Sequence, residues 1–170
     1  DLNSTLPVQH PTHIQGISLE SLAENFGTPL YVYDGEKIFN QVKTLQEAFS
    51  AAPLKVKYAT KALSNTNILK LIRKAGAGVD AVSIEEVKLG LMAGYRAEEI
   101  MYTPSGVAFD EIQEAVKLGV MVNLDSIPLM RKFGETYGAT VSACIRINPH
   151  IMAGGNLKIS VGHKESKFGI

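Results

Sequence analysis

Cysteine is almost absent from this sequence, because its 170 residues include only Cys144. A single cysteine cannot form an internal disulfide, which agrees with a reducing compartment. Its apolar surroundings favour a buried structural thiol over a nucleophile. An excess of charge of either sign is also absent, since 17 basic residues balance 17 acidic ones. We therefore expect neither nucleic acid nor an anionic membrane as a partner.

Long apolar runs are missing too, although 45% of the residues are hydrophobic. No run is long enough to span a bilayer, and no basic start precedes an apolar signal segment. We expect a cytoplasmic globular protein without a membrane partner. His10 and His13 lack accompanying cysteines or an acidic cluster. We therefore expect no metal site.

Short apolar segments alternate with helical patterns from residue 56 onward. The pattern predicts strands at 56–59, 78–82, 100–103, 121–124 and 140–147, and helices at 67–75, 84–93, 109–118 and 127–137. Glycines at positions 76, 94, 119 and 138 fit left-handed helix C-caps. Apolar strands joined by helices imply a parallel sheet covered by helices.

Such a sheet is either an open doubly wound sheet or a (β/α)₈ barrel. A dinucleotide-binding open sheet needs Gly-x-Gly-x-x-Gly after its first strand, and no such spacing is present. We therefore predict an α/β fold that forms the first part of a TIM-type barrel over residues 35–170. Only about five βα units are present where a barrel needs eight. We expect a portion of a larger protein.

Residues 1–34 are predicted to form a separate unit. It would contain a loose lead-in at 1–13, a short helix that starts at Ser18 and ends at Gly27, and a strand at 30–33. Asp34 is expected to cap the next helix, which runs to about residue 50.

Polar side chains gather where the predicted strands end. They are Lys61, Asp80, Ser83, Thr103, Pro104, Ser105, Asn123, Asp125, Ser126, Arg146 and Asn148. Catalytic groups of barrel enzymes lie at this rim. Lys61, if held there against apolar neighbours, would have a lowered pKa and could attack a carbonyl as an amine.

Asp80 and Arg146 lie within apolar strands, where an unpaired charge is costly. We expect them to pair with each other or with Lys61, either as part of a site or as an ion pair that only fixes the barrel interior. The loop at 148–169 is long for a βα connection and contains Gly154, Gly155, Lys158 and two histidines. Its length favours a functional role.

The ordered motifs resemble the fold-type III pyridoxal-phosphate-dependent decarboxylases, and the diaminopimelate decarboxylase group in particular. They are Thr-Pro-Leu-Tyr-Val-Tyr-Asp at 28–34, Tyr-Ala-Thr-Lys-Ala at 58–62, Val-Asp-Ala-Val-Ser at 79–83, Asn-Leu-Asp-Ser at 123–126, Arg-Ile-Asn-Pro at 146–149 and Ser-Lys-Phe-Gly at 166–169. Together they span nearly the whole chain in order.

The resemblance implies an alanine racemase-like barrel in which Lys61 forms an aldimine with pyridoxal phosphate. Asp80, Arg146 and, as a weaker candidate, Ser83 would line the cofactor site. The implied reaction is decarboxylation of meso-2,6-diaminopimelate to L-lysine with release of CO₂, a step of lysine biosynthesis. The implied assembly is a homodimer with shared active sites, and the strand at 30–33 would pair into a β-rich domain outside this sequence. The chain alone is expected to be inactive.

Other interpretations stay open from the sequence. Another member of the superfamily, an ornithine, arginine or carboxynorspermidine decarboxylase or a racemase, would share the cofactor chemistry. A non-catalytic barrel that binds pyridoxal phosphate as a carrier or regulator would share the lysine. The ring-stacking, phosphate-binding and substrate-reading groups of the family lie outside these residues.

Overall fold

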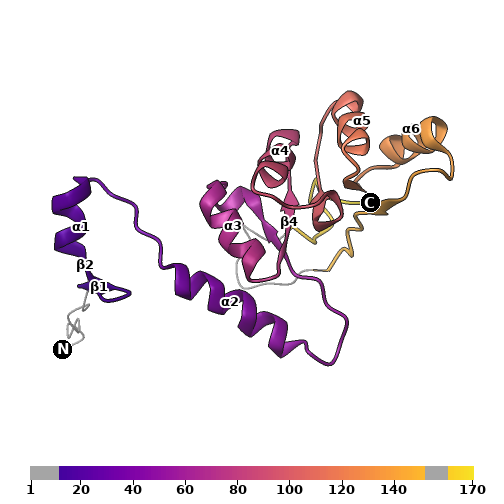
Figure 1. Cartoon of the computed structure of the whole chain (residues 1–170). Coiled ribbons are helices and arrows are strands. Elements are labelled where there is room, and N and C mark those ends of the chain that lie inside the picture. The colour runs from indigo at the N-terminus through magenta and orange to yellow at the C-terminus, as the bar shows by residue number, and fades with distance from the viewer. Residues whose placement is uncertain (1–11, 152–160) are drawn as a thin grey trace, which may run out of the picture.

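A five-stranded parallel sheet forms the centre of the molecule in a computed structural model, which describes residues 12–151 and 161–170 (Figure 1). Its strands are β3 (Lys57–Ala59), β4 (Gly78–Ala81), β5 (Ile100–Tyr102), β6 (Met121–Leu124) and β7 (Ala143–Ile145). Each strand pairs in parallel with its neighbour in the chain. The strand order follows the order of the chain without a reversal. A barrel requires such an order, whereas a doubly wound sheet reverses its strand order at one point. The predicted partial barrel is confirmed.

Four helices connect the strands and lie in an arc along one face of the sheet (Figure 1). They are α3 (Thr66–Lys74), α4 (Ile84–Met92), α5 (Phe109–Lys117) and α6 (Ile127–Tyr137), and two short 3₁₀ turns, η1 (Thr60–Ala62) and η2 (Ala97–Glu99), accompany them. The four glycines predicted as C-caps all have positive φ. The left-handed conformation ends each helix where the sequence indicated.

The sheet has one buried face and one half-buried face, which β4 makes plain. Val79 and Ala81 are fully buried in the core beneath the helices, whereas Gly78 and Asp80 are half-buried. Side chains alternate between the faces of a strand, so Asp80 belongs to the face that the helices leave uncovered. That face is the barrel interior. Cys144 lies on β7 and is half-buried rather than buried as predicted.

Of the N-terminal elements, only β1 (His13–Ile14), β2 (Ile17–Ser18) and α1 (Leu19–Phe26) stand apart from the sheet (Figure 1), whereas α2 (Gly35–Ala48) packs against α3. A hairpin of β1 and β2 leads into α1. The longer α2 follows, and the Asp34 carboxylate caps it by accepting a hydrogen bond from the Lys37 backbone N–H at 2.9 Å. The predicted helix starts at Ser18 and Asp34 are confirmed.

The strand predicted at 30–33 is wrong for this chain, because these residues join no sheet in the part of the chain that the structure describes. Tyr31 is 87% exposed. Aromatic and β-branched residues favour a strand only where a partner strand supplies the hydrogen bonds, so pairing with a further β-rich domain stays a prediction.

The hairpin was not predicted, and residues 1–11 of the expected lead-in lie outside the described residues. No helix described in the structure is both long enough and apolar enough to cross a membrane.

Candidate active site

Lys61 lies in η1, directly after β3, at the carboxyl end of the sheet. The preceding Thr60 is fully buried, and its carbonyl accepts a hydrogen bond from the Leu63 N–H at 3.1 Å, which closes the turn. Lys61 itself is exposed. We expected apolar neighbours to bury and activate this lysine, but it is exposed in the described chain. The turn that carries it lies on the side of the sheet that the helices leave uncovered.

A cavity of about 380 Å³ brings together five of the eleven predicted rim residues. It is lined by Lys61, Asp80, Val82, Thr103, Ser105, Arg146, Val161 and Phe168. These residues come from the ends of β3, β4, β5 and β7 and from the C-terminal segment. The carboxyl ends of parallel strands meet at one edge, so residues far apart in sequence converge there.

Asp80 is held by a hydrogen bond rather than by a positive charge. The Thr103 hydroxyl donates to Asp80 Oδ1 at 2.5 Å. The expected ion pair with Arg146 or Lys61 does not form among the described residues. The hydroxyl is nearer in space because Thr103 directly follows β5, which pairs with β4.

Arg146 directly follows β7 and lines the cavity. Its backbone N–H donates to the Leu124 carbonyl at 2.8 Å, which continues the β6–β7 pairing. Its guanidinium carbon lies 4.4 Å from the centre of the Phe168 ring. The sequence marked Phe168 only as part of the Ser-Lys-Phe-Gly motif and gave no sign of this contact.

Ser83 lies outside the cavity lining, unlike Lys61, Asp80 and Arg146, with which the resemblance grouped it. Its Oγ accepts a hydrogen bond from the Glu86 N–H at 3.2 Å, and the Glu86 carboxylate accepts one from the Val82 N–H at 2.8 Å. These reciprocal bonds satisfy free N–H groups at the start of α4. In this structure Ser83 is a helix cap.

The loop after β7 is organised by Asn148, which is 9% exposed. Its side-chain amide donates to the His163 carbonyl at 3.0 Å and accepts from the His150 N–H at 3.0 Å. Both histidines take part through their backbones in these bonds. Gly154, Gly155 and Lys158 of the loop that we expected to be functional lie outside the described residues.

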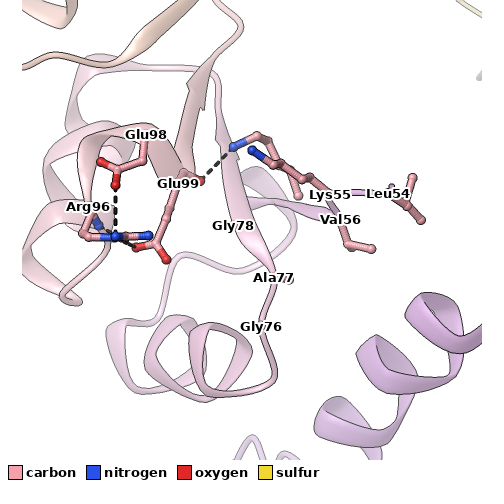
Figure 2. Close-up of a pocket in the computed structure, with 10 residues that line it drawn as sticks. Leu54, Lys55, Val56, Gly76, Ala77, Gly78, Arg96, Glu98 and Glu99 are labelled. Atoms are coloured by element: carbon pink, nitrogen blue, oxygen red, sulfur yellow. Dashed lines mark hydrogen bonds and ion pairs between the residues drawn. The ribbon is translucent and has the colours of Figure 1, made fainter. Parts of the chain in front are cut away.

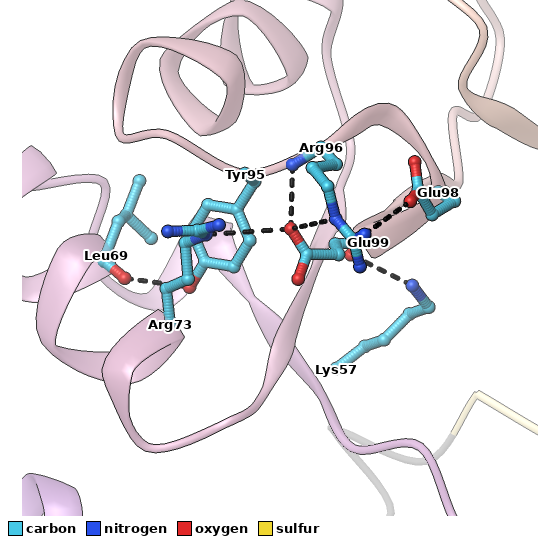
Figure 3. A network of polar contacts seen from close by, with 7 residues as sticks. All are labelled: Lys57, Leu69, Arg73, Tyr95, Arg96, Glu98 and Glu99. Atoms are coloured by element: carbon cyan, nitrogen blue, oxygen red, sulfur yellow. Dashed lines mark hydrogen bonds and ion pairs between the residues drawn. The ribbon is translucent and has the colours of Figure 1, made fainter.

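The opposite end of the sheet carries a different polar cluster around Glu99 (Figure 3). The Glu99 carboxylate accepts from the Arg96 N–H at 2.7 Å and lies 3.6 Å from the Nε atoms of Arg73 and Arg96. Its backbone carbonyl accepts from Lys57 Nζ at 2.9 Å. Burial, the largest influence, lowers the pKa of Lys57.

A smaller cavity of about 240 Å³ lies at this amino end, lined by residues that include Gly78, Arg96 and Glu99 (Figure 2). Residues at this end of a barrel serve stability, whereas chemistry lies at the carboxyl end. Lys57 begins β3 and Lys61 follows it, so the two lysines lie at opposite ends of the sheet.

The fold is a partial (β/α)₈ barrel, and its carboxyl rim carries a lysine, a carboxylate and a guanidinium. These features are those of a barrel protein with a candidate site for a carbonyl ligand. Residues 35–170 match the family model described as "Pyridoxal-dependent decarboxylase, pyridoxal binding domain". The chain belongs to this family. The resemblance identified from the motifs is confirmed, and with it the expected fold class and pyridoxal phosphate as the cofactor.

Relatives with this architecture are similar over nearly the whole chain. Diaminopimelate decarboxylase from Methanothermobacter thermautotrophicus is 36% identical over 92% of this chain and 37% of its own length. The solved Helicobacter pylori diaminopimelate decarboxylase, complexed with L-lysine, has a TM-score of 0.78 and 36% identity over 88% of this chain and 39% of that one. The M. jannaschii enzyme, also with L-lysine, has a TM-score of 0.80 and 32% identity over 93% of this chain and 39% of that one. The chain thus spans well under half the length of these relatives.

Proposed function

We propose that this chain is the cofactor-binding part of a pyridoxal-phosphate-dependent decarboxylase that converts meso-2,6-diaminopimelate to L-lysine and CO₂. The observation that carries the proposal is the convergence of Lys61, Asp80 and Arg146 on one cavity at the carboxyl end of the sheet. The named relatives at 36% identity support diaminopimelate as the substrate.

The residues of the cavity fit pyridoxal phosphate chemically. The Lys61 amine can condense with an aldehyde, and a guanidinium such as that of Arg146 complements anionic oxygens. The Asp80 carboxylate can accept hydrogen bonds from a ligand bound in the cavity. When bound, the cofactor supplies an electron sink for the bond that breaks.

The reaction is balanced without an oxidant or reductant. The bond between the α-carbon and its carboxylate breaks, CO₂ leaves, and a proton takes the place of the carboxylate on the same carbon. The chain's own groups bind and orient, with Lys61 as the covalent attachment point and Asp80 held in place by Thr103. We further propose a homodimer with shared active sites, and Ser83 as a helix cap outside the cofactor contacts.

Reduction of the loaded full-length protein with borohydride, followed by peptide mass mapping, tests the attachment point. We expect the label on Lys61, with Lys61→Arg unlabelled and Lys57→Arg labelled as in the wild type. A label on Lys57 or Lys70 would overturn the assignment. Absence of any label would remove the cofactor proposal as a whole.

Substrate choice needs a separate assay of CO₂ release. We expect turnover of meso-2,6-diaminopimelate and little from ornithine, arginine or carboxynorspermidine. A second candidate is a decarboxylase for a smaller diamine precursor, because the lysine/ornithine decarboxylase from Vibrio vulnificus has a TM-score of 0.63 and 26% identity over 69% of this chain and 32% of that one. Preference for ornithine would favour that candidate, and cofactor binding without CO₂ release would indicate a carrier.

A further inference from the structure

The Ser-Lys-Phe-Gly segment at 166–169 makes a contact that the proposed function does not use. Phe168 lines the candidate cavity, and the centre of its ring lies 4.4 Å from the guanidinium carbon of Arg146. We propose that Phe168 is a positioning residue, whose ring holds the Arg146 guanidinium at the cavity wall for the anionic oxygens of the bound cofactor or substrate. This inference rests on the proposed function, since it assigns the support of Arg146.

The backbone around Phe168 is docked against the chain that leaves β7. The Ile170 N–H donates to the Arg146 carbonyl at 2.9 Å, and the Asn148 N–H donates to the Ile170 carbonyl at 2.8 Å. These paired hydrogen bonds fix the last described residues beside Arg146. The ring of Phe168 is thereby brought to the guanidinium by backbone bonding and not by side-chain contact alone.

Gly169 permits this close approach. Its φ is +80°, and a Cβ at this position would lie 2.7 Å from the Asn148 nitrogen and 2.9 Å from the Ile147 carbonyl carbon. Real Cβ atoms do not approach backbone so closely, and other residues rarely adopt this φ. Glycine is therefore required for the segment to lie against Arg146.

Ser166 sets the conformation just before the ring. Its hydroxyl accepts a hydrogen bond from the Phe168 N–H at 3.3 Å, and its own N–H donates to the His163 carbonyl at 3.0 Å. The serine, the phenylalanine and the glycine of the motif thus have one combined result, which is the placement of the ring.

The ring has little competition for Arg146. Among residues 12–151 and 161–170, no ion pair involves this guanidinium. A guanidinium over an aromatic face is stabilised at a partly exposed site by an energy that corresponds to a factor of about two to five in an equilibrium constant. Arginine also has many rotamers, so a guanidinium released from the ring would spread over several positions.

The test compares Phe168→Leu, which removes the ring, with Phe168→Tyr, which keeps it, in the full-length protein. The first measurement is the rate at which phenylglyoxal modifies Arg146 in the cofactor-free protein, read by peptide mass mapping. We expect Phe168→Leu to raise this rate by a factor of about two to five and Phe168→Tyr to leave it unchanged. Should Phe168→Leu fail to fold, Phe168→Met replaces it.

Two matched controls separate this effect from general loosening. Phe109→Leu removes a ring that lies 4.7 Å from Lys132 Nζ, outside the cavity lining, and should leave Arg146 labelling unchanged. Lys167 Nζ also lies 5.1 Å from the Phe168 ring. Lys167→Met should likewise leave Arg146 labelling unchanged. An increase with either control equal to that of Phe168→Leu would overturn the proposal.

The second measurement is the dissociation constant of pyridoxal phosphate. We expect Phe168→Leu to weaken binding by a factor of about two to five, Arg146→Ala to weaken it at least as much, and the double variant to match Arg146→Ala alone. Additive losses, or equal labelling of Arg146 in wild type and Phe168→Leu, would overturn the positioning role. If the wild type binds no pyridoxal phosphate while labelling responds as expected, the proposed function fails and the Phe168–Arg146 contact stands.

Discussion

Thr103 and Asp80 share a hydrogen bond of 2.5 Å across neighbouring strands at the wall of the candidate cavity. The bond engages one carboxylate oxygen of Asp80, Oδ1. A neutral hydroxyl restrains Asp80 without cancelling its charge. An ion pair with Arg146 would have placed the same carboxylate while neutralising both groups.

Replacement of Thr103 tests this arrangement. Thr103→Val keeps the shape of the side chain but removes the donor. We expect the dissociation constant of pyridoxal phosphate to rise by about three- to tenfold, because a typical intramolecular hydrogen bond contributes about 1 kcal/mol. Thr103→Ser retains the hydroxyl and should stay close to wild type. Equal affinity in all three proteins, measured by absorbance titration, would leave Thr103 without a role.

Gly78 at the amino end of the sheet should tolerate no larger side chain. A Cβ there would collide with the Glu99 carbonyl oxygen, so we expect Gly78→Ala to lower the free energy of unfolding by about 3 kcal/mol. Gly134 in α6 is the control, since a Cβ at that position would meet nothing within 4 Å. Gly134→Ala should raise stability by about 0.5–1 kcal/mol. Urea unfolding measures both, and equal stability of the two variants would contradict the prediction.

Tyr95 and Tyr102 are both buried, but only one hydroxyl is bonded in the described structure. Tyr95 donates to the Leu69 carbonyl at 2.8 Å, whereas the Tyr102 hydroxyl has no partner among the described residues (Figure 3 shows the former). We expect Tyr95→Phe to cost about 1 kcal/mol and Tyr102→Phe to be neutral or stabilising. Thermal unfolding distinguishes the two, and a larger loss for Tyr102→Phe would reveal a partner for its hydroxyl.

Alkaline pH should separate Tyr102→Phe from the wild type further. Burial, then the charges of Glu111 and other acids, raises the pKa of Tyr102 to about 12 from an ordinary value of 10.0. Keeping this hydroxyl neutral in the folded state contributes to the free energy of unfolding, and the contribution is fully present below pH 10. It is lost as pH rises toward 12, because the tyrosine ionises first in the unfolded chain. The unfolding midpoint of the wild type should therefore fall more steeply over this window than that of Tyr102→Phe. Parallel pH profiles would contradict this assignment.

Glu99 gives the opposite dependence at acid pH. The Arg96 N–H, followed by the charges of Arg96 and Arg73, lowers the pKa of Glu99 from 4.5. Its carboxylate therefore stabilises the fold above pH 4.5, and this contribution is lost as pH falls through the lowered pKa. We expect Glu99→Gln to cost about 0.5–1 kcal/mol at neutral pH and progressively less in acid, as urea unfolding at a series of pH values would measure. Glu98→Gln, which removes only an exposed pair with Arg96, should change stability by less than about 0.3 kcal/mol.

The central sheet could be predicted from sequence because its signals are local. Each of the first four strands is followed by a glycine-terminated helix, and α6 lies where the pattern placed it. The segment at 30–33 failed because a strand needs a partner, and its own composition carries no information about one. The hairpin was missed because its two-residue strands are too short to show an alternating pattern.

The candidate site could also be predicted only in part from the sequence. The positions of Lys61, Asp80 and Arg146 on one rim followed from strand ends alone, since parallel strands bring these ends together. Their contacts did not, because the Thr103–Asp80 bond depends on the register of two strands and the Phe168–Arg146 contact on the path of a long loop. Ser83 was a weaker candidate for the cofactor site from the sequence, and its hydrogen bond with Glu86 indicates a helix cap instead.

The pairing of every strand in the parallel sheet with its immediate predecessor bears on how the chain folds during synthesis. Each βα unit can add to a sheet that already exists, without waiting for a distant segment to emerge from the ribosome. Such sequential growth keeps the loop that must close at each step short, which lowers its entropic cost.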